Sequence, residues 1–245
     1  MCSHYDRGRK EPTIFLAYDY FLFMIPAMVL TMWAQARITR AYAAGSRIPA
    51  RAGVTGAEAA SMVMQAGGAT GVTIEPVEGE LSDHYDPRRK VLRLSHGVYD
   101  SRSLAAIGIA AHEAGHAIQD ASHYPGLVVR NLIVPMASLG SMLFWIPTLT
   151  GAILGVMKLV VLGIILFSLT VVFQLVNLPV EFNASRRGRQ FLQSTGLVSA
   201  DEDPVVGKVL NAAALTYVAA ALTSVFQLLY FLVRSGLLGG RRRQS

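Results

Sequence analysis

Cysteine is almost absent from this sequence, which has one, Cys2, among 245 residues. A single thiol cannot form a disulfide within the chain. It also cannot supply the several thiolates of a cysteine-based metal site. An intrachain disulfide and a cysteine-based metal site are therefore both excluded.

Charged residues are also scarce. Asp, Glu, Lys and Arg together form 16% of the chain, whereas soluble domains carry about 25%. Hydrophobic residues reach 52%. These proportions exclude an ordinary soluble domain and predict a membrane protein.

Acidic residues are the scarcer of the two charged kinds, which leaves a formal net charge of +6. A basic chain can bind nucleic acid, but this sequence contains no nucleic-acid-binding module. In a membrane protein, an excess of Lys and Arg ordinarily sets the orientation and contacts anionic lipid. We therefore expect the lipid bilayer as a partner and no nucleic acid.

Three stretches are apolar along almost their whole length, and they are residues 14–36, 131–178 and 211–233. A helix that spans a bilayer needs about 20 apolar residues, so the middle stretch is long enough for two spans. We expect a mainly α membrane protein with four transmembrane helices. They are placed at 14–36, 131–153, 157–178 and 211–233, and the middle two form a hairpin.

Residues 14–36 have an alternative interpretation as a cleaved signal peptide. Basic residues precede this stretch, and it ends in Ala34 and Ala36, as such peptides often do. The apolar stretch is longer than a signal peptide needs, and Trp33 stands beside the cleavage site. These two features favour an uncleaved membrane anchor.

Four spans place the polar segments 37–130 and 179–210 on one side of the membrane. The N-terminal tail, 1–13, and the basic C-terminal tail, 234–245, then lie on the other side. The two polar segments are expected to assemble one split catalytic domain. Many Lys and Arg of this side lie close to span ends, so the positive-inside rule favours a cytoplasmic catalytic face.

The most informative motif is H-E-x-x-H, formed by His112, Glu113 and His116. Positions i and i+4 lie on one face of an α-helix, so the two imidazoles can bind one zinc ion. Glu113 points to the side of that pair, where it can act as general base on a zinc-bound water. Serines near residue 102 and an Ala/Ile/Leu-rich body predict one helix over about 102–121. Two hydrogen-bonded histidines in a buried helix are the alternative.

The rest of the first polar segment predicts an α+β arrangement. Thr55 and Glu58 form a capping box that predicts a helix to about residue 65. Residues 71–77 and 90–94 have the alternation of short strands, and 83–87 has the composition of a turn. We therefore expect a short β-hairpin or small sheet beside the catalytic helix.

A catalytic zinc takes three protein ligands and keeps one open position. The metzincin extension requires glycine and histidine where this chain has Gln119 and Ser122, so that class is excluded. His123 could approach the metal only if the helix continued to it. Glu181, which opens the second polar segment just after a proline, is the better candidate for the third ligand. Its alternative role is an interfacial charge paired with a neighbouring arginine.

The oxyanion that develops during peptide hydrolysis needs a donor besides zinc. His84 and Tyr85 are the candidates, because their segment leads into a strand that could pair with an extended peptide. The alternative makes both ordinary turn residues. No substrate-binding residue can be assigned from the sequence.

Several of these segments together resemble the YugP-type neutral zinc metallopeptidases of bacterial membranes. The segments are HEAGHAIQ at 112–119, DHYDP at 83–87, LRLS at 92–95, EFNASRR at 181–187, LTMWAQ at 30–35 and AAALTY at 212–217. The resemblance covers most of the chain. It implies a gluzincin-like peptidase of the bacterial cell membrane, with one zinc held by His112, His116 and Glu181.

A more distant similarity is to the HtpX-type and C-a-a-X prenyl proteases, which place E-x-x-A-D after their H-E-x-x-H. Here Ser185 stands where that family has the aspartate that orients a zinc histidine. A hydroxyl can accept the same hydrogen bond, but less strongly than a carboxylate can.

We therefore expect a membrane zinc endopeptidase that hydrolyses protein or peptide substrates. The rival hypothesis is a catalytically silent scaffold whose zinc only holds the split domain together while it binds client proteins. The presence of Glu113 argues against the rival, because a structural zinc site has no use for a base. The identity of the substrate and the oligomeric state are not encoded in these patterns.

Overall fold

The structure, a computed structural model, describes residues 14–238, with side chains from residue 18 onward. The expected tail 1–13, which includes Cys2, lies outside the described residues, as do residues 239–245 of the expected basic tail. The elements are α1 (Ile14–Ser46), α2 (Gly56–Ala66), β1 (Thr73–Val77), β2 (His84–Asp86), β3 (Val91–Ser95), α3 (His96–Tyr99), α4 (Leu104–Ala121), α5 (Pro125–Leu143), α6 (Trp145–Leu154), α7 (Met157–Ser194) and α8 (Asp203–Arg234).

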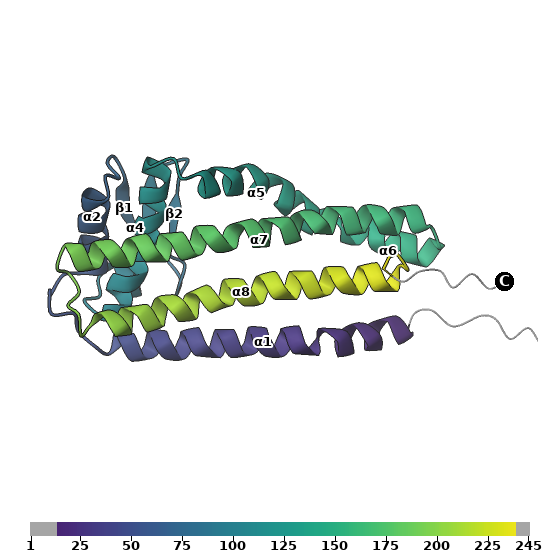
Figure 1. Cartoon of the computed structure of the whole chain (residues 1–245), viewed down its shortest axis with the longest axis horizontal. Coiled ribbons are helices and arrows are strands. Elements are labelled where there is room, and N and C mark those ends of the chain that lie inside the picture. The colour runs from purple at the N-terminus through teal and green to yellow at the C-terminus, as the bar shows by residue number, and fades with distance from the viewer. Residues whose placement is uncertain (1–13, 239–245) are drawn as a thin grey trace, which may run out of the picture.

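Long apolar helices run along the molecule, while α2, α4 and the strands gather at one end (Figure 1). Four helical segments are long and apolar enough to cross a membrane: α1, the pair α5–α6, α7 and α8. The expectation of a mainly α protein with four such helices and a small sheet is confirmed. Helices α7 and α8 extend beyond the expected spans, so the boundaries placed after residues 178 and 210 fall inside continuous helices.

Prolines interrupt one apolar helix and leave another intact. The second candidate span divides at Phe144 into α5 and α6. Pro147 explains the break, because proline has no N–H for the carbonyl of Leu143 and its ring crowds that carbonyl. Pro179 has the same defect but lies inside α7, which continues to Ser194. The residues after Pro179, which open the second polar segment, therefore continue the helix of the third span.

The sheet has three strands in the order β1-β3-β2. Strands β1 and β3 are parallel, and β2 pairs antiparallel with β3, with Tyr85 opposite Leu92. The expectation of a simple turn at 83–87 was wrong, because its centre forms β2. Asp86 explains the turn-like composition, since its side chain accepts hydrogen bonds from the backbone of Arg88 and Arg89 in the β2–β3 turn.

The two polar segments share one hydrophobic core at this end of the molecule. Buried side chains of α2, β3 and α4 pack with Leu192, Leu197 and Val206 from the second polar segment. Polar contacts also join the segments: Arg51 donates its backbone N–H to Glu202 at 2.8 Å and forms an ion pair with Asp201 at 2.5 Å. The two polar segments thus pack into one body, although the second and third candidate spans separate them in the sequence.

Candidate metal centre

Helix α4 carries the H-E-x-x-H motif at the centre of this core. Ser103 caps its first turn by accepting a hydrogen bond from the backbone N–H of Ala106 at 3.2 Å. Most residues of the helix are buried, and many of them are small. His112 and His116 lie one turn apart, with ring centroids 4.9 Å apart in an edge-to-face arrangement. Helical periodicity therefore places both imidazoles on one face, as i,i+4 spacing requires.

Helix α7 crosses α4 at very short range, and two glycines make this approach possible. A Cβ on Gly115 would lie 2.3 Å from the carbonyl oxygen of Ala184, and one on Gly188 would lie 2.2 Å from that of Ala111. Both distances are far below van der Waals contact, so neither position accepts a side chain without moving the backbone. The crossing sets Glu181 of α7 opposite the two histidines.

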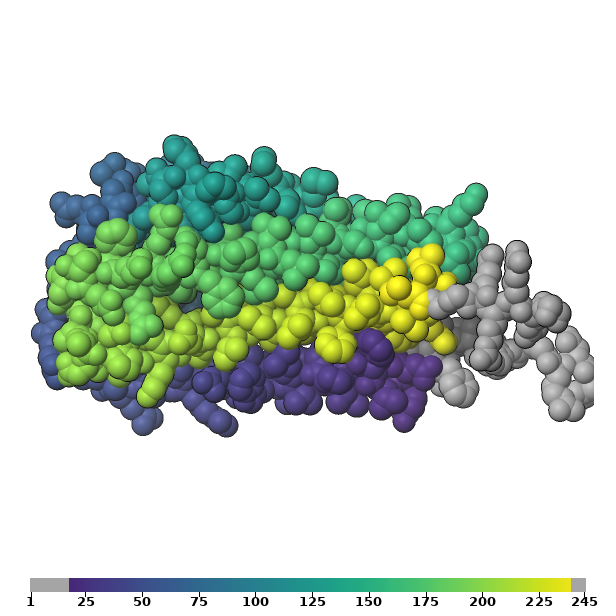
Figure 2. All heavy atoms as spheres, in the orientation of Figure 1, coloured from purple at the N-terminus to yellow at the C-terminus, as the bar shows by residue number. Residues whose placement is uncertain are grey.

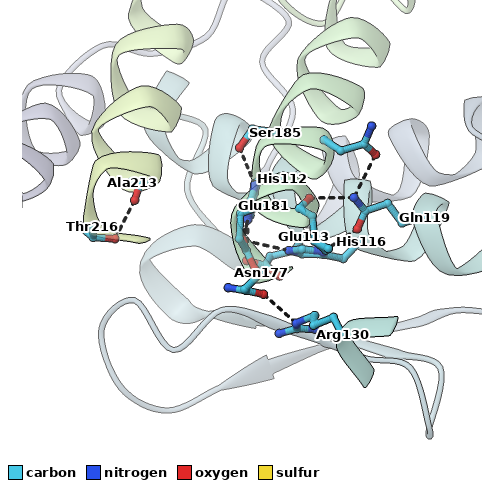
Figure 3. Close-up of polar contacts among 12 residues, drawn as sticks. His112, Glu113, His116, Gln119, Arg130, Asn177, Glu181, Ser185, Ala213 and Thr216 are labelled. Carbon is cyan, nitrogen blue, oxygen red and sulfur yellow. Dashed lines mark hydrogen bonds and ion pairs between the residues drawn. The ribbon is translucent and has the colours of Figure 1, made fainter. Parts of the chain in front are cut away.

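Three side chains converge in the gap between α4 and α7 (Figure 3). Glu181 Oε2 lies 3.3 Å from His112 Nε2 and 3.4 Å from His116 Nε2. One ligand atom from each residue lies within 4.8 Å of the others. The side chain of Glu181 is only 4% exposed, so the cluster is closed to bulk water on this side.

The hydrogen bonds around the histidines show that this cluster fits a cation. His116 Nδ1 is 3.0 Å from Gln119 Oε1, and His112 Nδ1 is 2.9 Å from Ser185 Oγ. His116 Nδ1 donates to Gln119, so His116 Nε2 presents its lone pair to Glu181. His112 Nε2 does the same when its Nδ1–H donates to Ser185. The Oε2 atom of Glu181 is buried and has no hydrogen-bond partner among the described residues. Three electron-rich atoms that face one another without a shared proton are stabilised by a divalent cation between them, and two imidazoles with one carboxylate suit zinc.

Gln119 fixes the orientation of His116. Its side-chain amide donates to the carbonyl of Val180 at 2.8 Å and to Asn183 Oδ1 at 3.0 Å. These bonds assign the amide nitrogen, so Oε1 must face His116 and accept from its Nδ1–H. Gln119 is fully buried, which makes this bridge between α4 and α7 rigid. Sequence reasoning used Gln119 to exclude the metzincin class and as part of the resemblance, but it did not find this contact.

Ser185 lies where its position four residues after Glu181 places it, on the same face of α7. Its hydroxyl contacts His112, which is the contact that the more distant family makes with aspartate. The structure thus brings Ser185 into contact with the candidate ligands. Its orienting role stays a prediction.

Glu113 lies beside the cluster without joining it. Its Oε1 is 4.0 Å from His112 Nε2, farther than Glu181 Oε2, and its side chain is 12% exposed. Burial raises the pKa of Glu113 to about 7, and the charges of Glu181 and Asp83 add to the rise, while His112 and the backbone N–H of Tyr85 oppose it. A divalent cation held beside it would lower this pKa again.

The side chains of His84 and Tyr85 point to other partners. The Tyr85 hydroxyl donates to Asp120 at 2.7 Å, while the exposed ring of His84 contacts the carbonyl of Ser82 at 2.8 Å. Asp120 also binds the Lys90 ammonium. The roles expected for His84 and Tyr85 in catalysis therefore stay predictions. His123 has a positive φ of 49° just after α4 ends, so the helix does not continue to it as a metal ligand would require.

Sequence reasoning missed a tyrosine that the structure brings to the site. Tyr217 of α8 is close enough to Glu181 for a hydrogen bond between their side chains, and it is also near Glu113 and Arg130. Arg130 in turn donates to Asn177 Oδ1 at 2.9 Å (Figure 3). No local spacing connects Tyr217 to the motif, because it lies inside an apolar run. Its one signal was its position at the end of the segment 212–217 that carried part of the resemblance.

Comparison with known proteins agrees with this geometry. A family model described as "Putative neutral zinc metallopeptidase" matches residues 20–236. The chain is 48% identical over 214 residues to the "Putative membrane protease YugP" of Bacillus subtilis (strain 168), covering 87% of this chain and 95% of that protein. No solved structure matches the chain. The match spans most of the chain, and the chain therefore belongs to this zinc metallopeptidase family.

Proposed function

From this family membership and the geometry of the cluster, we propose that the chain is a membrane-embedded endopeptidase that holds one zinc ion. The ligands in this proposal are His112, His116 and Glu181. The observation that carries it is the convergence of two Nε2 atoms on a buried carboxylate oxygen that has no hydrogen-bond partner among the described residues. The substrates are proteins or peptides.

Zinc bound at this site would lower the pKa of a water molecule to about 7 and polarise a peptide carbonyl. Glu113 accepts the proton from the attacking water and then delivers it to the leaving nitrogen. Its position supports this role, because it borders the cluster and its partly exposed carboxylate is not committed to either histidine. Gln119 and Ser185 hold the two imidazole rings so that both Nε2 atoms point at the metal position throughout the reaction.

The experiment that tests this function measures cleavage of an unstructured protein, casein, by the purified full-length chain. Cleavage is expected to stop when a chelator removes zinc and to return when zinc is restored. The zinc content should fall when cleavage stops and return to one zinc per chain when cleavage returns. Zinc bound at that ratio with no cleavage under any condition would favour the silent scaffold, which no observation on this structure supports.

Tyr217 is the group that we assign to stabilise the oxyanion. A phenol that borders both carboxylates of the site can donate to the carbonyl oxygen as negative charge develops on it. Hydrogen bonds to charged groups contribute about 1.5–3 kcal/mol. Tyr217→Phe should therefore lower kcat by about 10- to 100-fold with little change in KM.

Tyr85→Phe is the matched control for this assignment. It removes the same hydroxyl from the tyrosine that the sequence favoured, whose hydroxyl here donates to Asp120. Steady-state kinetics of both variants decide between them, with zinc content measured alongside. A larger loss of kcat in Tyr85→Phe than in Tyr217→Phe would return the role to Tyr85.

The proposed location is the cell membrane, with several spans and the catalytic domain on the cytoplasmic face. Four apolar helices and a relative named a membrane protease support a membrane protein. The cytoplasmic face rests on the Lys and Arg close to span ends. Protection of a C-terminal tag from added protease, compared between inverted and right-side-out vesicles, measures it directly.

A further inference from the structure

A cavity of about 330 Å³ lies between α7 and α8, close to the metal cluster but separate from it. Its walls include Phe182, Ser185 and Arg186 of α7 and Asn211 and Ala214 of α8. Ser185 contacts the Nδ1 atom of His112, whereas the metal ligands converge on Nε2 at the other side of that ring. The cavity therefore lies behind His112 and not where a scissile peptide would bind.

Positive charge in this cavity is uncompensated. Arg186 is exposed, and the described residues provide no hydrogen bond or ion pair for its side chain. The neighbouring arginines are engaged: Arg187 donates to Asn183 and Ser122, and Arg189 pairs with Asp203 at 2.5 Å. No Asp or Glu lines the cavity. An anion that enters it meets one free guanidinium and the polar groups of Ser185 and Asn211.

One end of the cavity lies at the depth expected for the headgroup layer of a membrane. On α7 the lining begins at Phe182, four residues after the expected end of the third span at 178, and on α8 it includes Asn211, where the last expected span begins. On α7, three apolar side chains share a face with Arg186: Val172, Leu175 and Phe182 are 48%, 50% and 48% exposed. This face changes from apolar to cationic within one turn, as a phospholipid does from acyl chain to phosphate.

We propose that this cavity binds an anionic phospholipid, with the phosphate at Arg186 and an acyl chain along Phe182, Leu175 and Val172. Helices α7 and α8 lie side by side with part of their surface outward, so a lipid can reach the groove between them (Figure 2). The bound headgroup is then one side chain, Ser185, away from a zinc ligand. Binding requires neither zinc nor peptidase activity, so its test is independent of the proposed function.

The test compares lipid binding by the full-length chain in detergent, measured by native mass spectrometry. The probes are phosphatidylglycerol and phosphatidylcholine with identical acyl chains. The native chain is expected to bind phosphatidylglycerol more tightly than phosphatidylcholine. Arg186→Gln should weaken phosphatidylglycerol binding about fivefold, since one basic residue contributes about that factor near an anionic surface. Arg186→Lys should retain most of the native affinity for phosphatidylglycerol.

Arg47→Gln is the matched control, because Arg47 is also exposed and near a span end but does not line the cavity. It should leave the affinity for phosphatidylglycerol unchanged within about twofold. Equal losses in Arg186→Gln and Arg47→Gln would overturn the proposal, as would equal affinity for the two lipids. Displacement of bound lipid by millimolar inorganic phosphate would also overturn it, because the site would then take a free anion. A thermal melt of each variant verifies that it is folded.

Discussion

Glu113→Gln is expected to lower kcat by about 100- to 10,000-fold while the chain keeps its zinc, because this is the range that a general base contributes. The amide has the size of the carboxylate but cannot accept a proton from water. Zinc should stay bound, since Glu113 Oε1 lies farther from His112 Nε2 than Glu181 Oε2 does. Steady-state cleavage of casein and the metal content of the same preparation measure the two quantities.

Glu181→Gln is the matched control, because it makes the same chemical change one helix away. The amide is a weak zinc ligand, and its neutral oxygen no longer attracts a cation between the two histidines. This variant should lose both zinc and activity. Comparison of the two variants distinguishes a general base from a zinc ligand. Loss of zinc in Glu113→Gln, or unchanged turnover by that variant, would contradict the role given to Glu113.

Much of the fold follows from rules that act along the sequence. A bilayer requires about 20 apolar residues per helix, so the three apolar stretches and the four spans that they hold were visible without tertiary information. The i,i+4 spacing fixes the relative position of His112 and His116, and a four-residue offset on α7 likewise relates Ser185 to Glu181. These inferences depend only on helical geometry, which neighbouring elements do not change.

The remaining features depend on how distant segments pack. Strand β2 was taken for a turn because it has three residues beside a genuine turn. Tyr217 reaches the cluster only because α8 lies against α4 and α7, and no spacing in the sequence records that contact. Gln119 follows His116 by three residues in α4, but its orientation depends on its bonds to Val180 and Asn183 of α7. The three-ligand site combines both cases. The positions of His112 and His116 follow from the geometry of one helix, whereas the position of Glu181 depends on how α7 crosses α4.

The α4–α7 crossing is held by backbone contact, and this makes Gly115 a sensitive position although it is not a ligand. In Gly115→Ala, the new methyl group would meet the carbonyl oxygen of Ala184 at 2.3 Å. Neither backbone can yield without separating the helices, because each is buried in the shared core. Overpacking of this kind costs about 1–3 kcal/mol or more. We expect a lower unfolding temperature and a loss of zinc, since Glu181 would move away from the histidines.

Gly108→Ala, in the same helix, isolates this effect. Alanine at either position gains about 1 kcal/mol of helix propensity over glycine. At Gly108, however, the new methyl group meets a methyl of Val206 at 3.1 Å, and a side chain can shift where a carbonyl cannot. Gly108→Ala should therefore keep its zinc and unfold close to the temperature of the native chain. If Gly115→Ala also retained full zinc and the native melting temperature, the close crossing would not be what positions Glu181. The glycine of the H-E-x-x-H motif would then need another explanation.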